Sequence, residues 1–509
     1  MRYYIISITF FCTFQAAAQP GFNRFYGLGY EVSSGFINGV CLHDTLYIAG
    51  MVQDDDNIQA VALIMADTNG NIISVHPYFD PDGLDLAFGV NYDIKVLPDE
   101  SIVFLAGKLT NLDNYLFRYD KTGTLLSVNK IDFPNFTDFD IYLNEIELYK
   151  DGLLIGGVVI DTNYIRRTCL IYTDYDGQVR WMKRYGHPPD YHEYRPCLSV
   201  IDDNTILLGT SLSTVIIGDT VFNSHLFAVD SLGMIKNVEW ENDPITKEEN
   251  IFDVKSLADG GFLLVTRQLE FQPGTYSLSW SVVVRLDSDR NVVWRKRISP
   301  SKWFFTTAYD LQPSLDGHWM VVEHVSFSPY NPASPVQEAG CITKFSIEGD
   351  IIWQTCDSVR WNLSVPTESK DYVSALVVLP SGSSVLAGFS TLEVPGPLHG
   401  YAWLMKVDAN GCMDAPCVVG TITAEEQPLY LSVYPNPAHS TVSIVLPNGI
   451  EFEKIKIYDQ LGSCVWQHLI VTGDSKSQVL DISGIPSGIY FLHAEGRENV
   501  VKTKLVILK

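Results

Sequence analysis

The sequence predicts an all-β protein, and three observations support this fold class. A turn signal, Asp or Ser followed three residues later by Gly or Arg, recurs between short apolar runs along most of the chain. The runs hold about six residues, which is a common strand length and too short for most helices. Hydrophobic residues make up 46% of the 509 residues and charged residues only 19%, so the chain can bury a large core.

The first 18 residues predict a signal peptide. Arg2 provides a positive start, Tyr3 to Phe14 form a mostly apolar stretch, and Ala16 to Ala18 are the small residues that precede a cleavage site. We expect cleavage after Ala18; a buried N-terminal strand is the alternative. Phe residues precede Cys12 where a lipoprotein signal has small ones, which disfavours lipid anchoring. No later segment has the ~20 apolar residues of a membrane helix, so no transmembrane segment is expected in the mature chain.

The turn signal divides residues 19–417 into seven repeated units. Its copies are Asp67 to Gly70, Asp120 to Gly123, Asp174 to Gly177, Asp230 to Gly233, Asp287 to Arg290, Ser346 to Gly349 and Asp408 to Gly411. The intervals between successive copies grow only from 53 to 62 residues. Such a regular period is typical of stacked or radially arranged repeats.

Each unit is expected to hold four strands. We call the turn marked by this signal the landmark turn. A second hairpin precedes each landmark turn, with turns of its own such as Leu257 to Gly261 and Leu379 to Gly382. Third strands such as Val282 to Leu286 are apolar at most positions, as expected for a sheet covered on both faces. We therefore predict a seven-bladed β-propeller over residues 19–417. An open solenoid of seven sheets is the alternative.

The two ends of the propeller segment predict how the ring closes. Phe22 to Gly27 resembles Trp181 to Gly186, the fourth strand and exit of the third unit. The seventh unit ends in Gly411 to Cys417, which lacks a good fourth strand. We expect residues 22–27 to complete the last blade.

Two repeated side-chain positions accompany the units. Trp181, Trp294 and Trp353 lie four residues after the landmark Gly or its replacement and are expected in the core. Another set lies two residues before the landmark and is expected to extend along blade edges toward water: Arg118, Arg285, Lys344 and Lys406.

Composition limits the partners. A net charge of −25 would repel nucleic acid and anionic membrane surfaces. Long irregular connections, such as Phe133 to Tyr142 and Gln268 to Trp280, gather at one end of the predicted ring and carry aromatic rings and carboxylates together. These groups suit a glycan or protein ligand, and the carboxylates could hold Ca²⁺. The alternatives are plain packing and solubility, a carbohydrate-active hydrolase or lyase, and a structural part of a surface assembly.

No residue is predicted to be catalytic, and no metal or cofactor is expected apart from the possible Ca²⁺. The sequence contains no G-x-S-x-G, Walker A or HExxH motif. His187 and His192, with Asp190 and Glu193, are the nearest approach to a metal set, but their spacing fits neither a helix nor a strand face. Asp54 to Asp56 is expected to cap a loop.

Eight cysteines remain after the signal peptide, and export permits disulfides. Cys341 and Cys356 lie symmetrically about the turn of one predicted hairpin, so they are candidates for a cross-strand disulfide. Cys412 and Cys417 flank a turn that contains proline and form a second candidate pair. Unpaired core cysteines are the alternative in both cases. The absence of a CxxC pair leaves a zinc or thioredoxin interpretation without support.

The last part of the chain differs in character. Residues 418–429 are taken as a linker, and almost all of the net negative charge lies before residue 430. Leu431 to Pro437, Ile455 to Gly462 and Leu480 to Leu492 follow in order, and Val500 to Leu508 forms a basic and apolar last strand. Together these stretches resemble the type A C-terminal sorting domain of type IX secretion cargo.

That resemblance implies a small Ig-like β-sandwich over residues 430–509 that contacts the type IX secretion machinery. It also implies passage through the periplasm of a Gram-negative bacterium to the outer-membrane surface or the medium, with removal by the system's peptidase or attachment to lipopolysaccharide. The residues that carry the motif are Pro435, Asn436, Pro437, Tyr458, Asp459, Gly462, Pro486, Gly488 and Tyr490. An ordinary adhesive sandwich is the alternative. We expect a secreted or surface-displayed binding protein.

Overall fold

A computed structural model gives the structure of the chain, which divides into two compact units, residues 1–422 and 423–509. The residues it describes are 21–28, 33–54, 56, 58–87, 93–108, 113–133, 140–160, 164–185, 192–193, 196–216, 219–241, 248–270, 278–299, 305–327, 337–358, 369–392, 399–413, 432–434, 438–445, 452–459, 464–469, 477–496 and 500–509. Every regular element within these ranges is a β-strand, as the sequence predicts.

In the first unit, antiparallel sheets that we call blades follow one another along the chain. The first blades are β2 (Ser33–Leu42), β3 (Thr45–Gln53), β4 (Gln59–Asp67) and β5 (Ile72–Tyr78); β6 (Leu86–Ala87), β7 (Ile94–Val96), β8 (Ile102–Lys108), β9 (Asn114–Tyr119) and β10 (Leu125–Lys130); and β11 (Asp140–Tyr149), β12 (Gly152–Ile160), β13 (Arg166–Thr173) and β14 (Val179–Arg184). Both β6 and β7 pair with β8, so they are two pieces of one edge strand.

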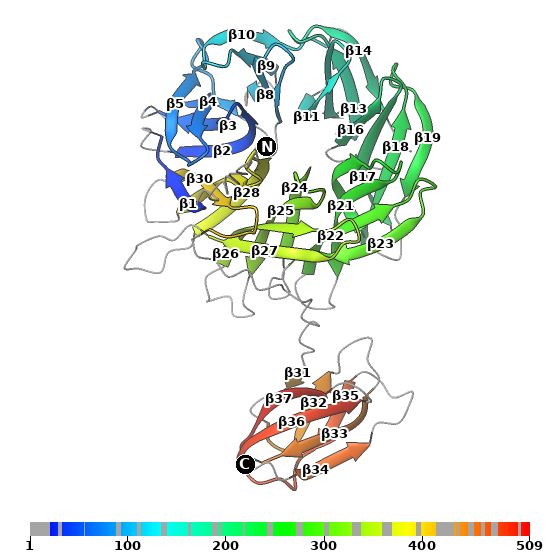
Figure 1. Cartoon of the computed structure of the whole chain (residues 1–509). Helices are drawn as coiled ribbons and strands as arrows, with labels where there is room; N and C mark the ends of the chain where they lie inside the picture. The colour runs from blue at the N-terminus through cyan, green and yellow to red at the C-terminus, as the bar shows by residue number, and fades with distance from the viewer. Residues whose placement is uncertain are drawn as a thin grey trace, which may run out of the picture. The chain divides into compact units, whose positions relative to one another are not determined.

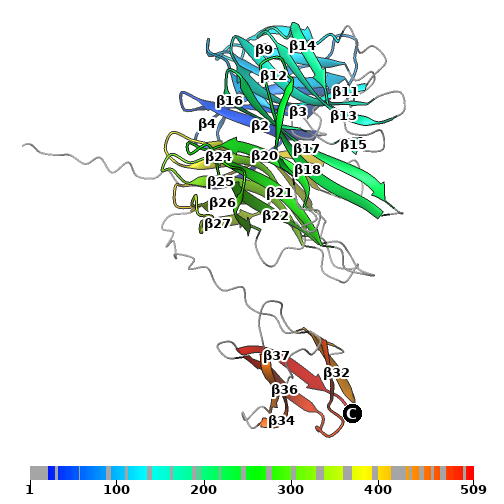
Figure 2. The ribbon, with the colours of Figure 1, turned by 90° about the vertical axis from the view of Figure 1, so that its right-hand side faces the viewer.

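The remaining blades repeat this arrangement. They are β15 (His192–Glu193), β16 (Cys197–Asp202), β17 (Thr205–Ile216), β18 (Asp219–Val229) and β19 (Ile235–Glu241); β20 (Glu248–Ser256), β21 (Phe262–Glu270), β22 (Leu278–Leu286) and β23 (Val292–Arg297); β24 (Phe305–Pro313), β25 (Trp319–Phe327), β26 (Gln337–Phe345) and β27 (Ile351–Asp357); and β28 (Ser369–Val378), β29 (Ser384–Leu392) and β30 (His399–Val407). The blades stand around a ring with their first strands innermost, which is a β-propeller (Figure 1). From the side, β17 and β18 reach beyond their neighbours (Figure 2).

The ring closes through the start of the chain. Strand β1 (Phe22–Tyr26) pairs antiparallel with β30, from Phe22 opposite Lys406 to Tyr26 opposite Ala402. Because β29 covers the other edge of β30, β1 becomes the outermost strand of the last blade. This pairing confirms the closure that the sequence predicts.

The landmark turns have one local cause. The first residue of each turn accepts hydrogen bonds from the backbone N–H groups two and four positions later, for example Asp230 Oδ1 from Leu232 and Met234 at 2.9 and 2.8 Å. The same pair of bonds forms at Asp67, Asp120, Asp174, Asp287, Ser346 and Asp408. The fourth residue has a positive φ, which favours Gly and is adopted by Arg290 at 71° in the degenerate copy.

The predicted tryptophans join neighbouring blades. Trp353 is 5% exposed, and its Nε1 donates to the carbonyl oxygen of Ala409 in the next blade's landmark turn at 3.2 Å. Trp294 Nε1 makes the equivalent bond to Ile347 O at 3.1 Å. A Cβ added at Gly411 would lie 2.6 Å from the Trp353 ring, so the turn must carry glycine for this close approach as well as for its φ.

The cations two residues before the landmark do not all reach water as we expected. Lys406 is fully buried and donates to Thr68 O at 2.7 Å, and Lys344 is 4% exposed. Arg118, Arg285 and Lys344 instead form ion pairs with an aspartate in the preceding hairpin turn of their own blade, Asp99, Asp259 and Asp316 respectively, at 2.6 to 2.7 Å. The expectation that these charges extend toward water was therefore wrong for Lys344 and Lys406, which are buried, whereas Arg118 and Arg285 stay partly exposed. Arg118, Arg285 and Lys344 each join the two turns of their blade, and Lys406 joins the last blade to the first.

The second unit consists of two antiparallel sheets. One contains β31 (Ser432–Tyr434), β32 (Thr441–Val445) and β35 (Ser477–Asp481), and the other contains β34 (Cys464–Leu469), β33 (Phe452–Tyr458), β36 (Gly488–Gly496) and β37 (Val500–Ile507). Residues from both sheets, including Val442, Leu480, Ile455 and Leu492, share one buried apolar core.

Candidate functional site

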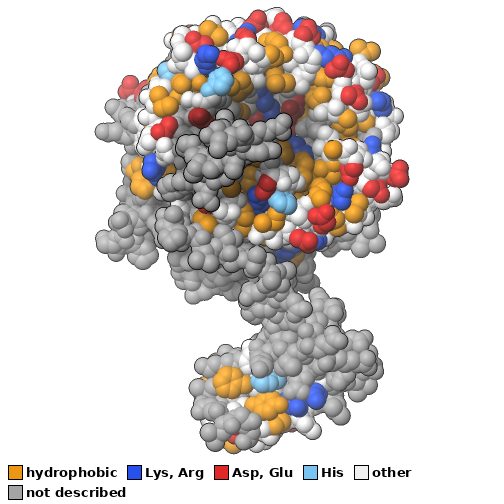
Figure 3. Space-filling view, in the orientation of Figure 1, with side chains coloured by type: hydrophobic (Ala, Val, Ile, Leu, Met, Phe, Trp, Pro, Cys, Tyr) orange, Lys and Arg blue, Asp and Glu red, His pale blue; other side chains and the backbone are white. Residues whose placement is uncertain are grey.

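The centre of the propeller contains a polar cavity of about 90 Å³. Its lining comes from the innermost strands β2, β7, β11, β20, β24 and β28. The charged residues among the lining are Asp93, Lys95, Glu145, Glu147, Asp253, Lys255 and Asp310. Figure 3 shows acidic and basic side chains together in the hollow middle of the ring.

A repeated bulge turns these side chains toward the cavity. The pairing of five innermost strands shifts by one residue, at Ile37, Asn144, Phe252, Tyr309 and Ser374. A bulge re-aims the side chains beside it, and it recurs here at one level of the ring. In four of the strands the next residue is polar and lines the cavity: Asn38, Glu145, Asp253 and Asp310.

Three cavity aspartates also join their own blade to the next one along the chain. Asp93 Oδ2 accepts from the backbone N–H of Ile146 at 3.4 Å, across the seam between the second and third blades. Asp253 Oδ2 accepts from Leu311 N at 2.8 Å, and Asp310 Oδ2 accepts from Leu376 N at 3.0 Å.

The second oxygen of each aspartate is engaged as well. Asp93 Oδ1 accepts from Ile94 N and from Asn38 Nδ2, and Asp253 Oδ1 accepts from Val254 N. Asp310 Oδ1 accepts from Gln312 Nε2 at 2.7 Å. These carboxylates are therefore part of the ring's own structure.

Two lysines offset part of the negative charge. Lys95 Nζ lies 2.9 Å from Asp93 Oδ2 and 3.4 Å from Glu147 Oε1, and Lys255 Nζ lies 2.9 Å from Asp253 Oδ1. Burial alone would lower the pKa of Lys95, but its two carboxylate neighbours raise that pKa well above the ordinary value. The pKa of Lys255 is raised in the same way, chiefly by Asp253.

The pKa of Asp310 is raised, as expected for a carboxyl group that is buried beside another carboxylate. Burial, and then the negative charge of Asp253, raise it from 3.8 to about 6, although Lys255 and the donors of Leu376 and Gln312 oppose the rise.

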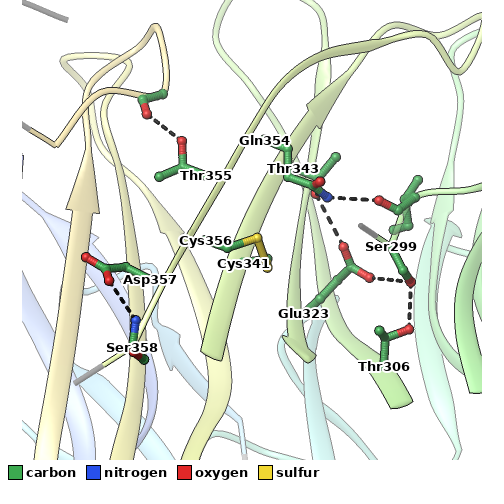
Figure 4. The surroundings of a disulfide bond; sticks show 12 residues. Ser299, Thr306, Glu323, Cys341, Thr343, Gln354, Thr355, Cys356, Asp357 and Ser358 are labelled. Atoms are coloured by element: carbon green, nitrogen blue, oxygen red, sulfur yellow. Dashed lines mark hydrogen bonds between the residues drawn. A yellow bond between two sulfur atoms is a disulfide. The ribbon is translucent and has the colours of Figure 1, made fainter. Parts of the chain in front are cut away.

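A second buried carboxyl, Glu323, lies near the predicted disulfide (Figure 4). Its Oε1 accepts from Ser299 Oγ at 3.0 Å and its Oε2 from Thr343 Oγ1 at 3.3 Å. Burial raises the pKa of Glu323 to about 7, and these hydroxyl donors and the charge of Arg297 oppose the rise only in part. Glu323 lies between two blades, since Ser299 belongs to the preceding one, and it is not among the residues predicted from the sequence.

A buried His–Glu pair lies in the same blade. His324 Nε2 is 3.6 Å from Glu338 Oε2, and neither atom has a hydrogen-bond partner within the described part of the chain. The His324 ring packs against Tyr372 with ring centroids 5.5 Å apart. This pair could not be recognised in the sequence, because His324 and Glu338 lie on different strands.

The cysteine predictions have different outcomes. Cys341 and Cys356 face each other in the pairing of β26 with β27 and form a disulfide with Cα atoms 4.0 Å apart, as predicted (Figure 4). Cys412 is disulfide-bonded. Cys417 lies outside the described residues, so the pairing of Cys412 with Cys417 stays a prediction.

The other predicted loop residues are only partly described. Asp54 Oδ1 accepts from the N–H groups of Asp56 and Ile58, so this acid caps its loop as predicted. His187, Asp190 and most of Phe133 to Tyr142 lie outside the described residues, and His192 and Glu193 are described only as the backbone of β15. Within the described residues, no group of three or more His, Cys, Asp or Glu side chains could hold a metal ion.

The sorting-motif residues fall on the second unit. Tyr490 OH donates to Pro486 O at 2.9 Å, and a Cβ on Gly488 would lie 3.2 Å from the Tyr490 ring, so these three residues form one local turn. Tyr458 packs against His493 at 4.6 Å between ring centroids, next to Asp459 at the end of β33. The other motif residues, Pro435, Asn436, Pro437 and Gly462, lie outside the described residues.

Comparison with known proteins gives one family match. Residues 432–508 match the model of the secretion system C-terminal sorting domain. None of the curated proteins matches this chain. Of the residues that the structure describes, none forms a helix long and apolar enough to cross a membrane.

Several solved structures resemble the chain at low identity. An α-L-arabinanase of Penicillium chrysogenum complexed with arabinobiose is 12% identical over 78% of this chain and 99% of its own, with a TM-score of 0.39. A puromycin hydrolase is 12% identical over 85% of this chain and 62% of its own, with a TM-score of 0.46. The β-propeller domain of the trilobed protease from Pyrococcus furiosus is 9% identical over 74% of this chain and 98% of its own, with a TM-score of 0.39.

Proposed function

Because residues 432–508 form a type IX secretion sorting domain, which indicates export to the cell surface or the medium, we propose that this chain is an exported binding protein whose propeller captures a glycan or a protein. The observation that carries binding over catalysis is the state of the cavity aspartates. Asp93, Asp253 and Asp310 each have both carboxylate oxygens engaged, and in each case one oxygen accepts from a backbone N–H of the next blade.

The proposed route begins with the signal peptide, residues 1–18, and passage through the periplasm. In the proposed organisation, residues 19–417 form the propeller, 418–429 a linker and 430–509 an Ig-like sandwich that the secretion machinery recognises. The paired sheets of residues 432–508 support the sandwich. We propose that Pro435 to Pro437 form a rigid turn at its start, and Gly488 begins β36, the strand that contains Tyr490. The mature protein is then either released or retained at the surface.

We propose seven blades in the ring. The support is the succession of four-stranded sets from β2 to β30, with β1 completing the last, and the seven turns capped by Asp or Ser. In this arrangement the turns within each blade's hairpins lie at one end of the ring. The long connections lie at the other end and offer the binding face.

A glycan array and a panel of protein ligands, probed with the purified mature chain, test the proposal. Binding to a defined glycan or protein without turnover is the expected result. The same ligands should be offered as substrates, since hydrolysis or lyase cleavage would support a carbohydrate-active enzyme and contradict the proposal. If the chain neither binds any of these ligands nor converts any of them, the proposal is contradicted and a structural role is favoured.

One observation favours that structural role as the second candidate. The outer strand β19 and the turn before it expose Leu232, Met234, Ile235 and Val238, each 48 to 63% accessible. Four exposed apolar side chains so close in sequence are the kind of surface that assembly partners cover. Concentration-dependent association of the mature chain, weakened by Leu232→Ser together with Met234→Ser, would support assembly.

A further inference from the structure

Strand β27 is the outermost strand of its blade. Among the described strands it pairs with β26 alone, from Gly340 opposite Asp357 to Phe345 opposite Ile351. An edge strand that pairs on one side only can separate from its sheet more easily than a central strand. The Cys341–Cys356 disulfide adds a covalent link between these two strands (Figure 4).

Two side chains of β27 hold the last blade. Trp353 Nε1 donates to Ala409 O at 3.2 Å. Thr355 Oγ1 donates to Gly411 O, and both acceptors lie in the landmark turn of the last blade. Cys356 follows Thr355 directly, and its side chain points to the opposite face of the strand because side chains alternate along a strand. The disulfide therefore fixes the same part of β27 that contacts the last blade.

The end of β27 also contacts the closing strand β1. Asn23 Nδ2 donates to Ser358 O at 3.0 Å, directly after β27 ends at Asp357. Asn23 Oδ1 accepts from Trp403 Nε1 of β30 at 2.6 Å. One side chain of β1 therefore joins the end of β27 to the last blade, and displacement of β27 would remove this bond from the ring closure.

We propose that the Cys341–Cys356 disulfide is a redox-sensitive latch on the closure of the ring. With the disulfide formed, β27 stays on β26 and keeps its contacts with the last landmark turn and with Asn23. With the disulfide reduced, β27 separates more often, and strand β1 loses protection together with it. The latch does not depend on the glycan or protein face proposed above, so each proposal can fail without the other.

The chemistry of the latch is thiol–disulfide exchange with a dithiol. A thiolate of the dithiol bonds to Cys356 Sγ, the less buried partner, while the S–S bond breaks and Cys341 Sγ leaves and takes up a proton. The second thiol of the dithiol then attacks the mixed disulfide, so that the dithiol becomes a disulfide and Cys356 becomes a thiol. Two electrons and two protons pass from the dithiol to the protein. Closing the latch is the reverse exchange, in which a disulfide accepts them.

Amide hydrogen exchange of the mature chain tests the latch through the paired variant Cys341→Ala with Cys356→Ala, which removes the cross-link. The amides of β27 and of β1 should both exchange about tenfold faster or more than in the parent chain, because a disulfide that closes a loop of about 15 residues opposes opening strongly. Strand β12, in the third blade, should change less than twofold. Faster exchange of β27 with unchanged β1 would overturn the proposal, since the disulfide would then act on its own hairpin only. Equal acceleration of β12 would also overturn it, since the whole propeller would then be destabilised.

The matched control is Cys169→Ala with Cys197→Ala. This pair removes two buried thiols that form no disulfide, and it should change the exchange of β1 less than twofold.

Reduction gives a second test that needs no substitution at the latch. In a Cys412→Ala background, which lacks the other disulfide, dithiothreitol should accelerate the exchange of β1 to the level of the paired variant, and reoxidation should restore protection. If the paired variant fails to fold, this measurement decides alone. Unchanged exchange of β1 in a chain whose Cys341 and Cys356 are reduced to thiols would contradict the latch.

Discussion

The carboxyl of Glu323 is fully buried, and its pKa of about 7 lies well above the ordinary value of 4.5. A group whose pKa is raised by folding contributes its full stability below the unfolded-state pKa and loses it as the pH rises through the folded-state value. The stability of the propeller should therefore decline between about pH 4.5 and pH 7 through this residue, because in that range the unfolded state releases the proton while the buried carboxyl keeps it.

Replacing Glu323 with Gln should remove this pH dependence. The amide keeps hydrogen bonding with Ser299 and Thr343 and cannot ionise, so Glu323→Gln should stabilise the fold at pH 8, by at most about 3 kcal/mol, and have little effect at pH 4. Urea unfolding at both pH values measures the difference. Glu348→Gln, at an exposed turn, is the control, and an equal effect of Glu323→Gln at both pH values would contradict the account.

Residues of the central cavity could not be predicted singly. Asp253 and Lys255, or Asp310 and Gln312, alternate with apolar residues as on any strand with one face in water, and only the ring turns that face toward an enclosed centre. The signal that could have revealed them is the repetition of polar residues two apart in the first strand of several units. Glu323 is harder to predict, because a single acid within an apolar strand does not show which neighbours surround it.

At the scale of elements, the landmark turns were predictable because their cause is local. An acid that accepts from the backbone two and four residues later needs no partner from elsewhere in the chain, and the residue with positive φ marks the turn. The disulfide between Cys341 and Cys356 was predictable for the same reason, since register within one hairpin follows from its turn. The ion pairs of Arg118 and Lys344 were not, because they join two separate hairpins.

The turn mechanism predicts the effect of removing one carboxylate. Asp230→Ala loses two hydrogen bonds to backbone donors and should destabilise the propeller by about 1 to 2 kcal/mol, whereas Asp230→Asn keeps an acceptor oxygen and should cost less. Chemical denaturation of the two variants beside the parent chain gives both values. The explanation fails if the alanine and asparagine variants are equally stable.

Strand β1 offers a matched pair of aromatic residues for testing the ring closure. Phe22 is 9% exposed and packs on the landmark turn at Gly70, while Phe25 is 46% exposed. Phe22→Ala should destabilise the propeller by about 3 kcal/mol, and Phe25→Ala by much less. Thermal unfolding compares them, and a greater loss from Phe25→Ala would show that β1 does not pack as described.

At the scale of the whole molecule, the repeat period predicted the propeller, and the motifs of the last 80 residues predicted the sorting domain. Repetition made the first prediction possible, since each unit must bury its faces against its neighbours and radial packing does this without free ends. The ligand could not be predicted, because much of the proposed binding face lies outside the described residues. The central cavity could not be predicted either, because it is assembled from strands up to about 340 residues apart.

The closed ring is the central claim, and amide hydrogen exchange of the mature chain tests it most directly. If β1 is the outer strand of the last blade, the amides of Asn23 to Tyr26 that bond to β30 will be protected to the same degree as those of β5 in the first blade. Complete exchange of this segment within seconds, with β30 still protected, would show that the N-terminal strand does not close the propeller.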